Sequence, residues 1–165
     1  MFTLKPISKD SIPNAVSKAE RYRLLNEPRL AESICLDILE IESNHHQALV
    51  ILLLSITDQY SRSPHSDVIE ARQLLPRLHN EYEQYYYGGI ICERHGKAIL
   101  NRDLNRADFM AYEWITEAMK LYEKAEAIRP SGNDDSILRW NTCVRLIHRN
   151  NLAPRTEEYF EPPLE

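Results

Sequence analysis

The sequence predicts an all-α protein with one folded domain. Apolar residues recur at steps of three and four, as on the buried face of a helix, and no stretch alternates convincingly as a strand would. The 165 residues include only four glycines, too few for a multistranded sheet with tight hairpins. Because 43% of the residues are apolar, the chain can bury a core of its own. We expect an N-terminal extension (1–12), a helical domain (13–150) and an acidic, proline-containing tail (151–165).

The first two expected helices each open near a proline. They cover about 13–25 and 28–42, and the short link between them predicts a helical hairpin. A third helix should span about 45–60 through the apolar run ALVILLL, which is far too short to cross a bilayer. The polar, proline-containing stretch SRSPHS at 61–66 predicts a loop.

From residue 67 onward the helical pattern hardly pauses. Pro76 cannot donate an interior helical hydrogen bond and crowds the preceding turn, so we expect a kink or break near 76–80. The next helix should cover about 81–100, and NRDLNR at 101–106 predicts the turn that follows it.

A long helix is expected over 107–128, followed by a last helix up to about residue 150. One apolar stripe of the long helix contains Met110, Trp114, Ala118, Tyr122 and Ala125, and Ala111, Ile115 and Met119 widen it. Pro130 and Gly132 should end the long helix, and Asn133 or Asp134 can cap the last one.

Two parts of the chain share a pattern of spacing. Ala31, Cys35, Ile38 and Ser43 follow one another at steps of four, three and five, and Ala118, Tyr122, Ala125 and Pro130 repeat those steps. This pattern resembles the tetratricopeptide repeat (TPR) family, whose second helices carry small, aromatic, small and proline residues at these steps. Ala19 and Tyr22, three residues apart, resemble its first helix. The resemblance covers residues 13–60 and 107–130.

The resemblance implies antiparallel helical hairpins stacked as a short right-handed solenoid with a C-terminal capping helix. A middle unit around Ala71 is longer than the family's period of about 34 residues, and the opening Trp is missing, so the repeats are degenerate. The alternative is another array of helical hairpins with small residues at its crossings. In a TPR-like stack the first helices line a concave groove that binds a peptide or another protein.

The resemblance also assigns groove-facing positions. These are Tyr86, Tyr87, Ile90, Glu93 and Arg94 on the helix over 81–100, and Asp134, Ile137, Asn141 and Arg145 on the last helix. Aromatic and arginine side chains often anchor interfaces, so the candidate partner-binding residues are Tyr86, Tyr87, Ile90, Arg94, Asn141 and Arg145. Two alternatives stay open. YYYGG at 85–89 fits a crowded helix crossing equally well, and Asp134 and Asp135 suit the positive end of a helix.

The tail carries a chemistry that such a groove could bind. Prolines break its helical pattern, and glutamates alternate with Tyr159, Phe160 and Leu164. One interpretation is a disordered terminus. The other is that the concave surface prefers acidic or C-terminal carboxylate segments and that this tail can occupy it, in its own chain or in a neighbouring one.

Composition argues against several other classes. The net charge of −5 disfavours nucleic-acid binding, and no glycine-rich phosphate loop is present. No histidine spacing fits a metal, and no nucleophile stands near an activating base, so we expect neither an enzyme nor a cofactor. The N-terminus lacks the apolar run of an export signal, which predicts a cytoplasmic protein without a membrane segment. Two alternatives are a self-associating structural protein, which would be a homo-oligomer, and a small helical metal-dependent enzyme.

Overall fold

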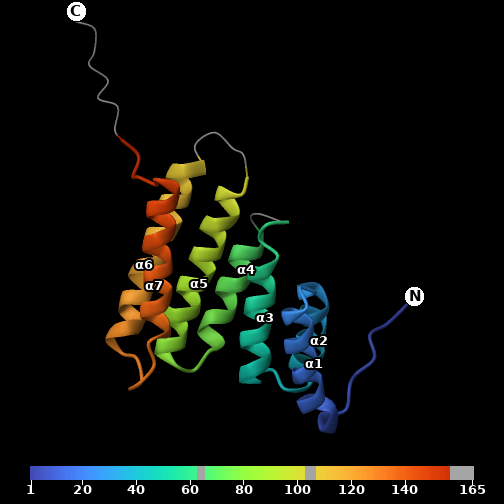
Figure 1. Cartoon of the computed structure of the whole chain (residues 1–165). Helices are drawn as coiled ribbons and strands as arrows, with labels where there is room; N and C mark the ends of the chain where they lie inside the picture. Colours follow the sequence, from blue (N-terminus) through green and yellow to red (C-terminus); the bar gives the residue numbers. More distant parts are fainter. Residues whose placement is uncertain (63–65, 103–106, 157–165) are drawn as a thin grey trace, which may run out of the picture.

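The computed structural model describes residues 1–62, 66–102 and 107–156, and all regular structure in these residues is helical. Its seven α-helices are α1 (Ile12–Leu24), α2 (Pro28–Ile41), α3 (His46–Asp58), α4 (Ser66–Leu74), α5 (Glu81–Leu100), α6 (Ala107–Ala127) and α7 (Asp135–Asn150) (Figure 1). The predicted all-α class is therefore confirmed.

Prolines and capping residues define several of the helix ends. Pro28 is the first residue of α2, and Pro76 lies in a short 3-10 segment, Leu75–Arg77, after which the chain leaves the helical conformation. Asn80 accepts a hydrogen bond from the amide of Glu83 and caps α5. At the other end of the fold, α7 stops at Asn151, which adopts a left-handed conformation with a φ of 50°.

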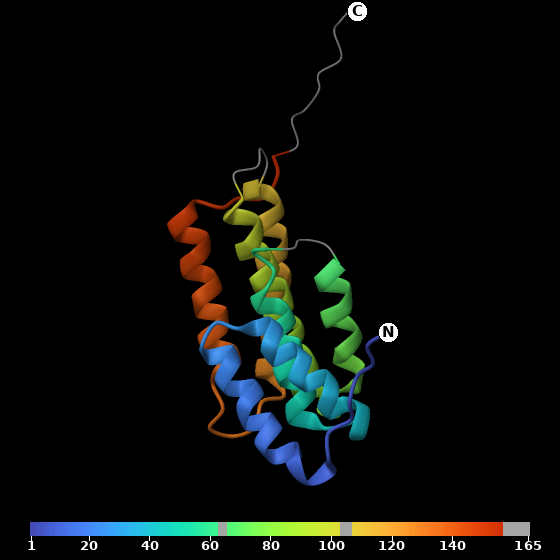
Figure 2. The ribbon, with the colours of Figure 1, turned by 90° about the vertical axis from the view of Figure 1, so that its right-hand side faces the viewer.

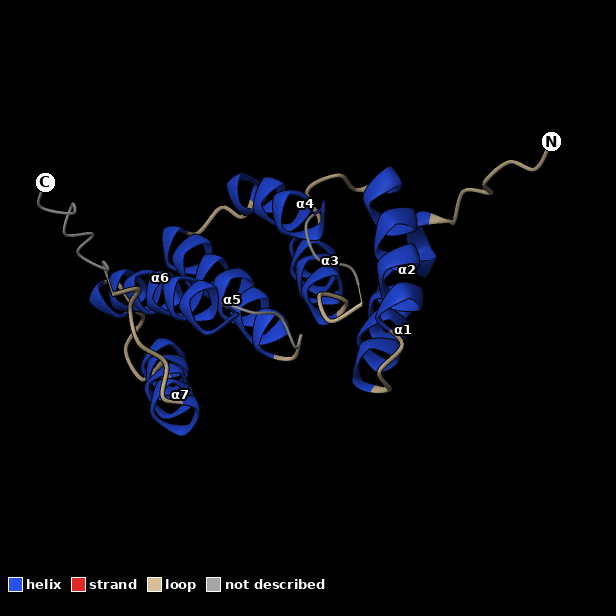
Figure 3. Ribbon diagram, turned by 90° about the horizontal axis from the view of Figure 1, so that it is seen from above, coloured by secondary structure: helices blue, strands red, loops and turns tan. Residues whose placement is uncertain are grey.

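The helices form two layers. Helices α2, α4 and α6 make one layer, and α1, α3, α5 and α7 make the other, as the view from above shows (Figure 3). Helices α1 and α7 project at the two ends of this second layer, so its surface curves inward. We call this surface, formed by α1, α3, α5 and α7, the inner face. Figures 1 and 2 show that its four helices run in the same direction, with their C-terminal ends at one end of the molecule.

Helix α3 is buried on most sides because it packs against α1 and α2 on one side and against α4 and α5 on the other. Leu49 and Leu53 are fully buried, and Ser55 and Thr57 are buried as well. The predicted core helix through ALVILLL is confirmed. Further along the chain, Trp114 of α6 packs against each of the three apolar clusters formed by the described residues and so connects them.

The close contact between α5 and α6 depends on glycine. A Cβ on Gly89 would stand 2.4 Å from the ring of Tyr122, and one on Gly96 would stand 2.8 Å from Ile115. The Tyr122 ring therefore occupies space that only glycine leaves open. Gly88 has ordinary room, since its nearest neighbour would lie at 3.5 Å. The interpretation of YYYGG as a crowded helix crossing is thus supported.

The buried stripe of α6 differs from the expected one at its start. Its buried residues are Ala107, Ala111, Ile115, Ala118, Tyr122 and Ala125. Met110 is 46% exposed, so its place in the predicted stripe was wrong. The true stripe follows the positions that face α5 and α7, where small residues allow close packing.

Helix α7 closes one end of the row. Cys143 and Ser136 are buried, and Trp140 packs with the cluster that contains Tyr122. The side chain of Asn133 accepts hydrogen bonds from the amide of Asp135 and from the hydroxyl of Tyr82. Asp134 holds the N-cap position but its side chain makes no capping hydrogen bond, and Asn133, the other predicted candidate, supplies the acceptor from one residue earlier.

Candidate functional site

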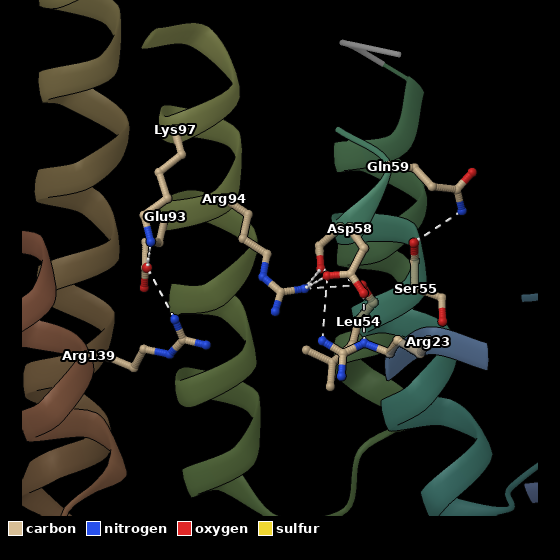
Figure 4. A network of polar contacts seen from close by, with 10 residues as sticks. Arg23, Leu54, Ser55, Asp58, Gln59, Glu93, Arg94, Lys97 and Arg139 are labelled. Carbon is tan, nitrogen blue, oxygen red and sulfur yellow. Dashed lines mark hydrogen bonds and ion pairs between the residues drawn. The ribbon is translucent and has the colours of Figure 1, made fainter. Parts of the chain in front are cut away.

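Charged side chains connect the four helices of the inner face (Figure 4). Asp58 on α3 lies between two arginines. Its Oδ2 is 2.7 Å from Nε of Arg23 on α1, and its Oδ1 is 2.5 Å from Nη1 of Arg94 on α5. All three side chains are between 19% and 24% exposed, so water screens these pairs only partly. This carboxylate therefore joins α1, α3 and α5.

Arg94 is held by the protein itself. Besides Asp58, its Nη1 donates to the hydroxyl of Thr57 at 2.6 Å and to the carbonyl oxygen of Leu54 at 3.2 Å. Burial lowers the pKa of its guanidinium, and the Asp58 carboxylate opposes that shift. Arg94 was predicted as a partner-binding residue. Its main contacts are internal, so replacing it would also disturb the packing of α3 on α5.

Glu93, the residue before Arg94, is a fully buried carboxylate. It receives a hydrogen bond of 2.6 Å from the Tyr122 hydroxyl on α6 and one of 3.2 Å from Arg139 on α7, and it also pairs with Lys97. Two cations compensate the buried charge, as such a charge requires. The expectation that Glu93 faces a groove was therefore wrong, because its side chain points into the α5–α6–α7 junction.

The Glu93 cluster shifts the titration of its partners. Burial together with the charge of Glu93 raises the pKa of Tyr122, so its hydroxyl stays a donor to the carboxylate. Burial alone would lower the pKa of Arg139, but the carboxylate of Glu93 reverses the effect and the net shift is upward. Arg139 therefore stays charged and pairs with this acid of α5.

An open hollow of about 330 Å³ lies on the inner face between the C-terminal halves of α3 and α5, beside α7. We call it the basic hollow. It is lined by Thr57, Asp58, Tyr60, Ser61, Arg94, Lys97, Ala98, Asn101 and Arg139. Lys97 and Arg139 are the accessible cations here, with 36% and 30% of their side chains exposed.

The basic hollow carries an excess of positive charge. Four cations, Arg23, Arg94, Lys97 and Arg139, share the two carboxylates of Asp58 and Glu93, which leaves two positive charges in excess. The C-terminal ends of α3 and α5 lie beside it, and each contributes roughly half a negative charge, so they offset about one of the two. A positive hollow in a chain of net charge −5 is suited to an anionic ligand.

A second hollow, of about 180 Å³, lies lower on the inner face between α1, α3 and α5. We call it the apolar hollow, because Val50, Ile51 and Tyr87 line it together with the exposed polar residues Glu20, His46 and Gln47. His46 is held by Glu83 of α5, with 2.6 Å between His46 Nε2 and the carboxylate. Burial raises the pKa of Tyr87 to about 12, so this phenol is neutral near pH 7.

The predicted binding residues fall into three places. Tyr87 lines the apolar hollow and Arg94 lines the basic one. Ile90 is 2% exposed and belongs to the core, so its assignment as a partner-binding residue was wrong. Tyr86 is half-buried and packs its ring on Tyr82, with centroids 5.8 Å apart.

Asn141 and Arg145 do not line either hollow among the described residues. Helical geometry places Asn141 about 200° round α7 from Arg139, which does line the basic hollow. Asn141 is half-buried and Arg145 is exposed. The structure therefore does not bring them together with Arg94 as one binding set.

The sequence interpretation missed Asp58 and Lys97 and did not connect Arg23 with them. One signal was available. Ile51 and Asp58, like Tyr87 and Arg94, are seven residues apart on neighbouring parallel helices, so each pair lies on one helix face. Each pair therefore has its first residue in the apolar hollow and its second in the basic hollow.

Three further chemistries to consider are metal binding, membrane insertion and nucleophilic thiols. The part of the chain that the structure describes contains no group of three or more His, Cys, Asp or Glu placed to hold a metal. None of its helices is long and apolar enough to cross a lipid bilayer. Burial raises the pKa of Cys35 and Cys143 to about 12, so these thiols are not activated as nucleophiles.

No protein-family model, no curated protein and no solved structure matches this chain.

Proposed function

We propose that this protein is an interaction module that binds an acidic segment of a peptide or protein on its inner face. The observation that carries the proposal is the basic hollow, whose lining residues and their direct ion-pair partners include four cations and only two carboxylates in an otherwise acidic chain. On this proposal the fold is a short TPR-like stack with degenerate repeats, and α7 is its capping helix.

The accessible cations define what the ligand offers. The Glu93 carboxylate is fully buried, whereas Lys97 and Arg139 retain contact with water and can each make a further hydrogen bond. A carboxylate entering the hollow would contact both and would add a charge-assisted bond without displacing Glu93. Arg94 and Arg23 already pair with Asp58, so they add to the positive electrostatic potential of the hollow without contacting the ligand.

The curved shape supports a peptide more than a small anion. The hollow is open to solvent, and a second hollow lies on the same row of parallel helices, so a chain lying along this row could reach both. Tyr87 and Val50 line the next hollow on the same face and offer apolar surface for a neighbouring side chain.

A titration with a labelled acidic peptide tests the proposal. A glutamate-rich peptide should bind with an affinity that falls steeply with added salt, and the same peptide with glutamine in place of glutamate should not. Lys97→Gln should weaken binding by about tenfold, because it removes one accessible charge. Equal binding of both peptides would overturn the proposal.

The matched control is Lys120→Gln on α6. Lys120 is 68% exposed and, like Lys97, pairs with a glutamate of its own helix, in this case Glu117. It lies in the other helix layer, so its replacement changes the net charge of the protein equally while leaving the basic hollow intact. Binding should be unchanged in this variant.

A further inference from the structure

The two hollows of the inner face are in register with each other. Ile51 and Asp58 of α3 are seven residues apart, and so are Tyr87 and Arg94 of α5. At about 1.5 Å per helical residue, each pair separates a residue of the apolar hollow from a residue of the basic hollow by roughly 10.5 Å along the helix axis. Because α3 and α5 are parallel, both helices give the same separation (Figure 1).

This separation selects one backbone conformation for a bound chain. In a polyproline II segment, residues three apart lie on the same side and about 9.3 Å apart, close to the spacing of the hollows. In a β-strand, same-side residues lie about 6.7 Å or 13.4 Å apart, which fits the spacing less well. A ligand in polyproline II conformation thus places an acidic and an apolar side chain in the two hollows when they are three residues apart.

The end of the fold from which a chain would enter sets the order of the two residues. The basic hollow lies beside the C-terminal ends of α3 and α5, and α7 ends at the same end of the molecule. After α7, Leu152 is buried against the cluster that contains Ile99 of α5. A chain continuing from there reaches the basic hollow first and the apolar hollow second.

The sequence of the tail has this pattern in this order. Residues 161–164 read Glu-Pro-Pro-Leu, so an acidic residue precedes an apolar one by three, with two prolines that favour polyproline II between them. These residues lie outside the described part of the chain. From Leu152 to Glu161 are nine residues, which reach up to about 30 Å when extended.

We propose that the inner face binds a segment in which an acidic residue precedes an apolar one by three, and that Glu161–Leu164 of the tail is its intramolecular ligand. Glu161 contacts Lys97 and Arg139, and Leu164 enters the apolar hollow beside Val50 and Tyr87. This inference rests on the proposed acidic-segment function, which it makes specific in spacing and direction. The short tether gives the tail an effective concentration in the millimolar range, so it competes with any external segment.

The test measures the fluorescence anisotropy of a labelled synthetic peptide with the sequence of residues 157–165. The receptor is the chain ending at Thr156, which keeps every described helix and the buried Leu152. The peptide should bind saturably, and Glu161→Gln or Leu164→Ser in the peptide should each weaken binding by about tenfold. The full chain should bind the peptide at least about tenfold more weakly than the shortened one, because its own tail competes.

Two further peptides test the spacing itself. One lacks Pro163 and the other has an additional proline after it, so the charge and the apolar residue stay the same while their separation changes. Both should bind about tenfold more weakly than the original peptide. In the receptor, Val50→Thr should weaken binding of the original peptide but not binding of the Leu164→Ser peptide. Only the original peptide places an apolar side chain in the apolar hollow.

The possible outcomes separate this inference from the proposed function. Equal binding of all spacing variants, with loss on Glu161→Gln, would overturn the two-hollow inference and leave the proposed acidic-segment function standing. If neither Glu161→Gln in the peptide nor Lys97→Gln in the receptor weakened binding, both the two-hollow inference and the proposed acidic-segment function would be overturned. Equal peptide affinity of the full and shortened chains would overturn the assignment of the tail as the intramolecular ligand.

Discussion

Glu93 and Arg94 are adjacent on α5 and connect this helix to neighbours on opposite sides. Arg94 reaches Asp58 of α3, whereas Glu93 binds Tyr122 of α6 and Arg139 of α7. Successive helical residues point about 100° apart, so a neighbouring pair of opposite charge can serve two interfaces at once. One peptide unit of α5 therefore links the two halves of the inner face (Figure 4).

Removing the charge of Glu93 should destabilise the fold. Glu93→Gln leaves Lys97 and Arg139 without their shared carboxylate, and we expect a loss of about 3 kcal/mol in the free energy of unfolding, as for other broken buried pairs. Glu117→Gln is the control, since its pair with Lys120 is exposed and should contribute less than about 1 kcal/mol. Urea denaturation of both variants measures the difference. Similar losses in the two would contradict the role given to Glu93.

Replacing each of two neighbouring glycines of α5 by alanine should change the stability of the fold in opposite directions. Gly89→Ala would place a Cβ 2.4 Å from the Tyr122 ring, and we expect a loss of about 1–3 kcal/mol from overpacking. Gly88→Ala has room at 3.5 Å and should gain about 0.5–1 kcal/mol, because alanine favours the helix. Thermal unfolding followed by circular dichroism compares them. A gain of similar size in both would show that α6 does not approach Gly89 as closely as described.

Ala118 tests the packing of α6. It is fully buried in the cluster around Tyr122, so Ala118→Phe should cost roughly 1–3 kcal/mol by forcing its neighbours apart. Ala127→Phe at the exposed end of the same helix is the matched control and should have little effect. Urea denaturation gives both values. Little loss in Ala118→Phe would place this residue outside the helix crossing.

Alkaline pH should weaken the fold through groups whose pKa is raised by burial. The pKa values of Cys35 and Cys143 rise from 9.0 to about 12, and that of Tyr87 rises from 10.0 to about 12. The unfolded chain loses these protons first, so the stabilisation is complete below about pH 9 and is lost as the pH approaches 12. Stability measured by urea denaturation from pH 8 to 11 should therefore decline, and less steeply in Tyr87→Phe. A flat profile would contradict the assigned burial.

Most helix positions could be predicted from the sequence because their signals are local. Proline marks the start of α2 and the break after Leu75, and the predicted helix over 81–100 coincides with α5. The apolar period also identified α3 as a buried helix. These features depend on neighbours within one or two turns, which a sequence shows directly.

The site could be predicted only in part because it depends on which helix lies opposite each side chain. Tyr87 and Arg94 line the two hollows of the inner face, but Ile90, between them, packs into the core. Glu93 looked like a surface charge because a sequence does not reveal that Tyr122 and Arg139 come from two other helices to meet it. Asp58 was missed for the same reason, since both of its arginines lie at least 35 residues away.

The Gly89–Tyr122 contact also limits how related sequences can diverge. The ring of Tyr122 fills the volume that a side chain at position 89 would need, so the two positions cannot change independently. A chain that gains a side chain at position 89 must lose the ring at position 122, and with it the hydroxyl that donates to Glu93. Among homologues that keep this helix pair, glycine and tyrosine are therefore expected to be inherited together or replaced together, along with the buried glutamate.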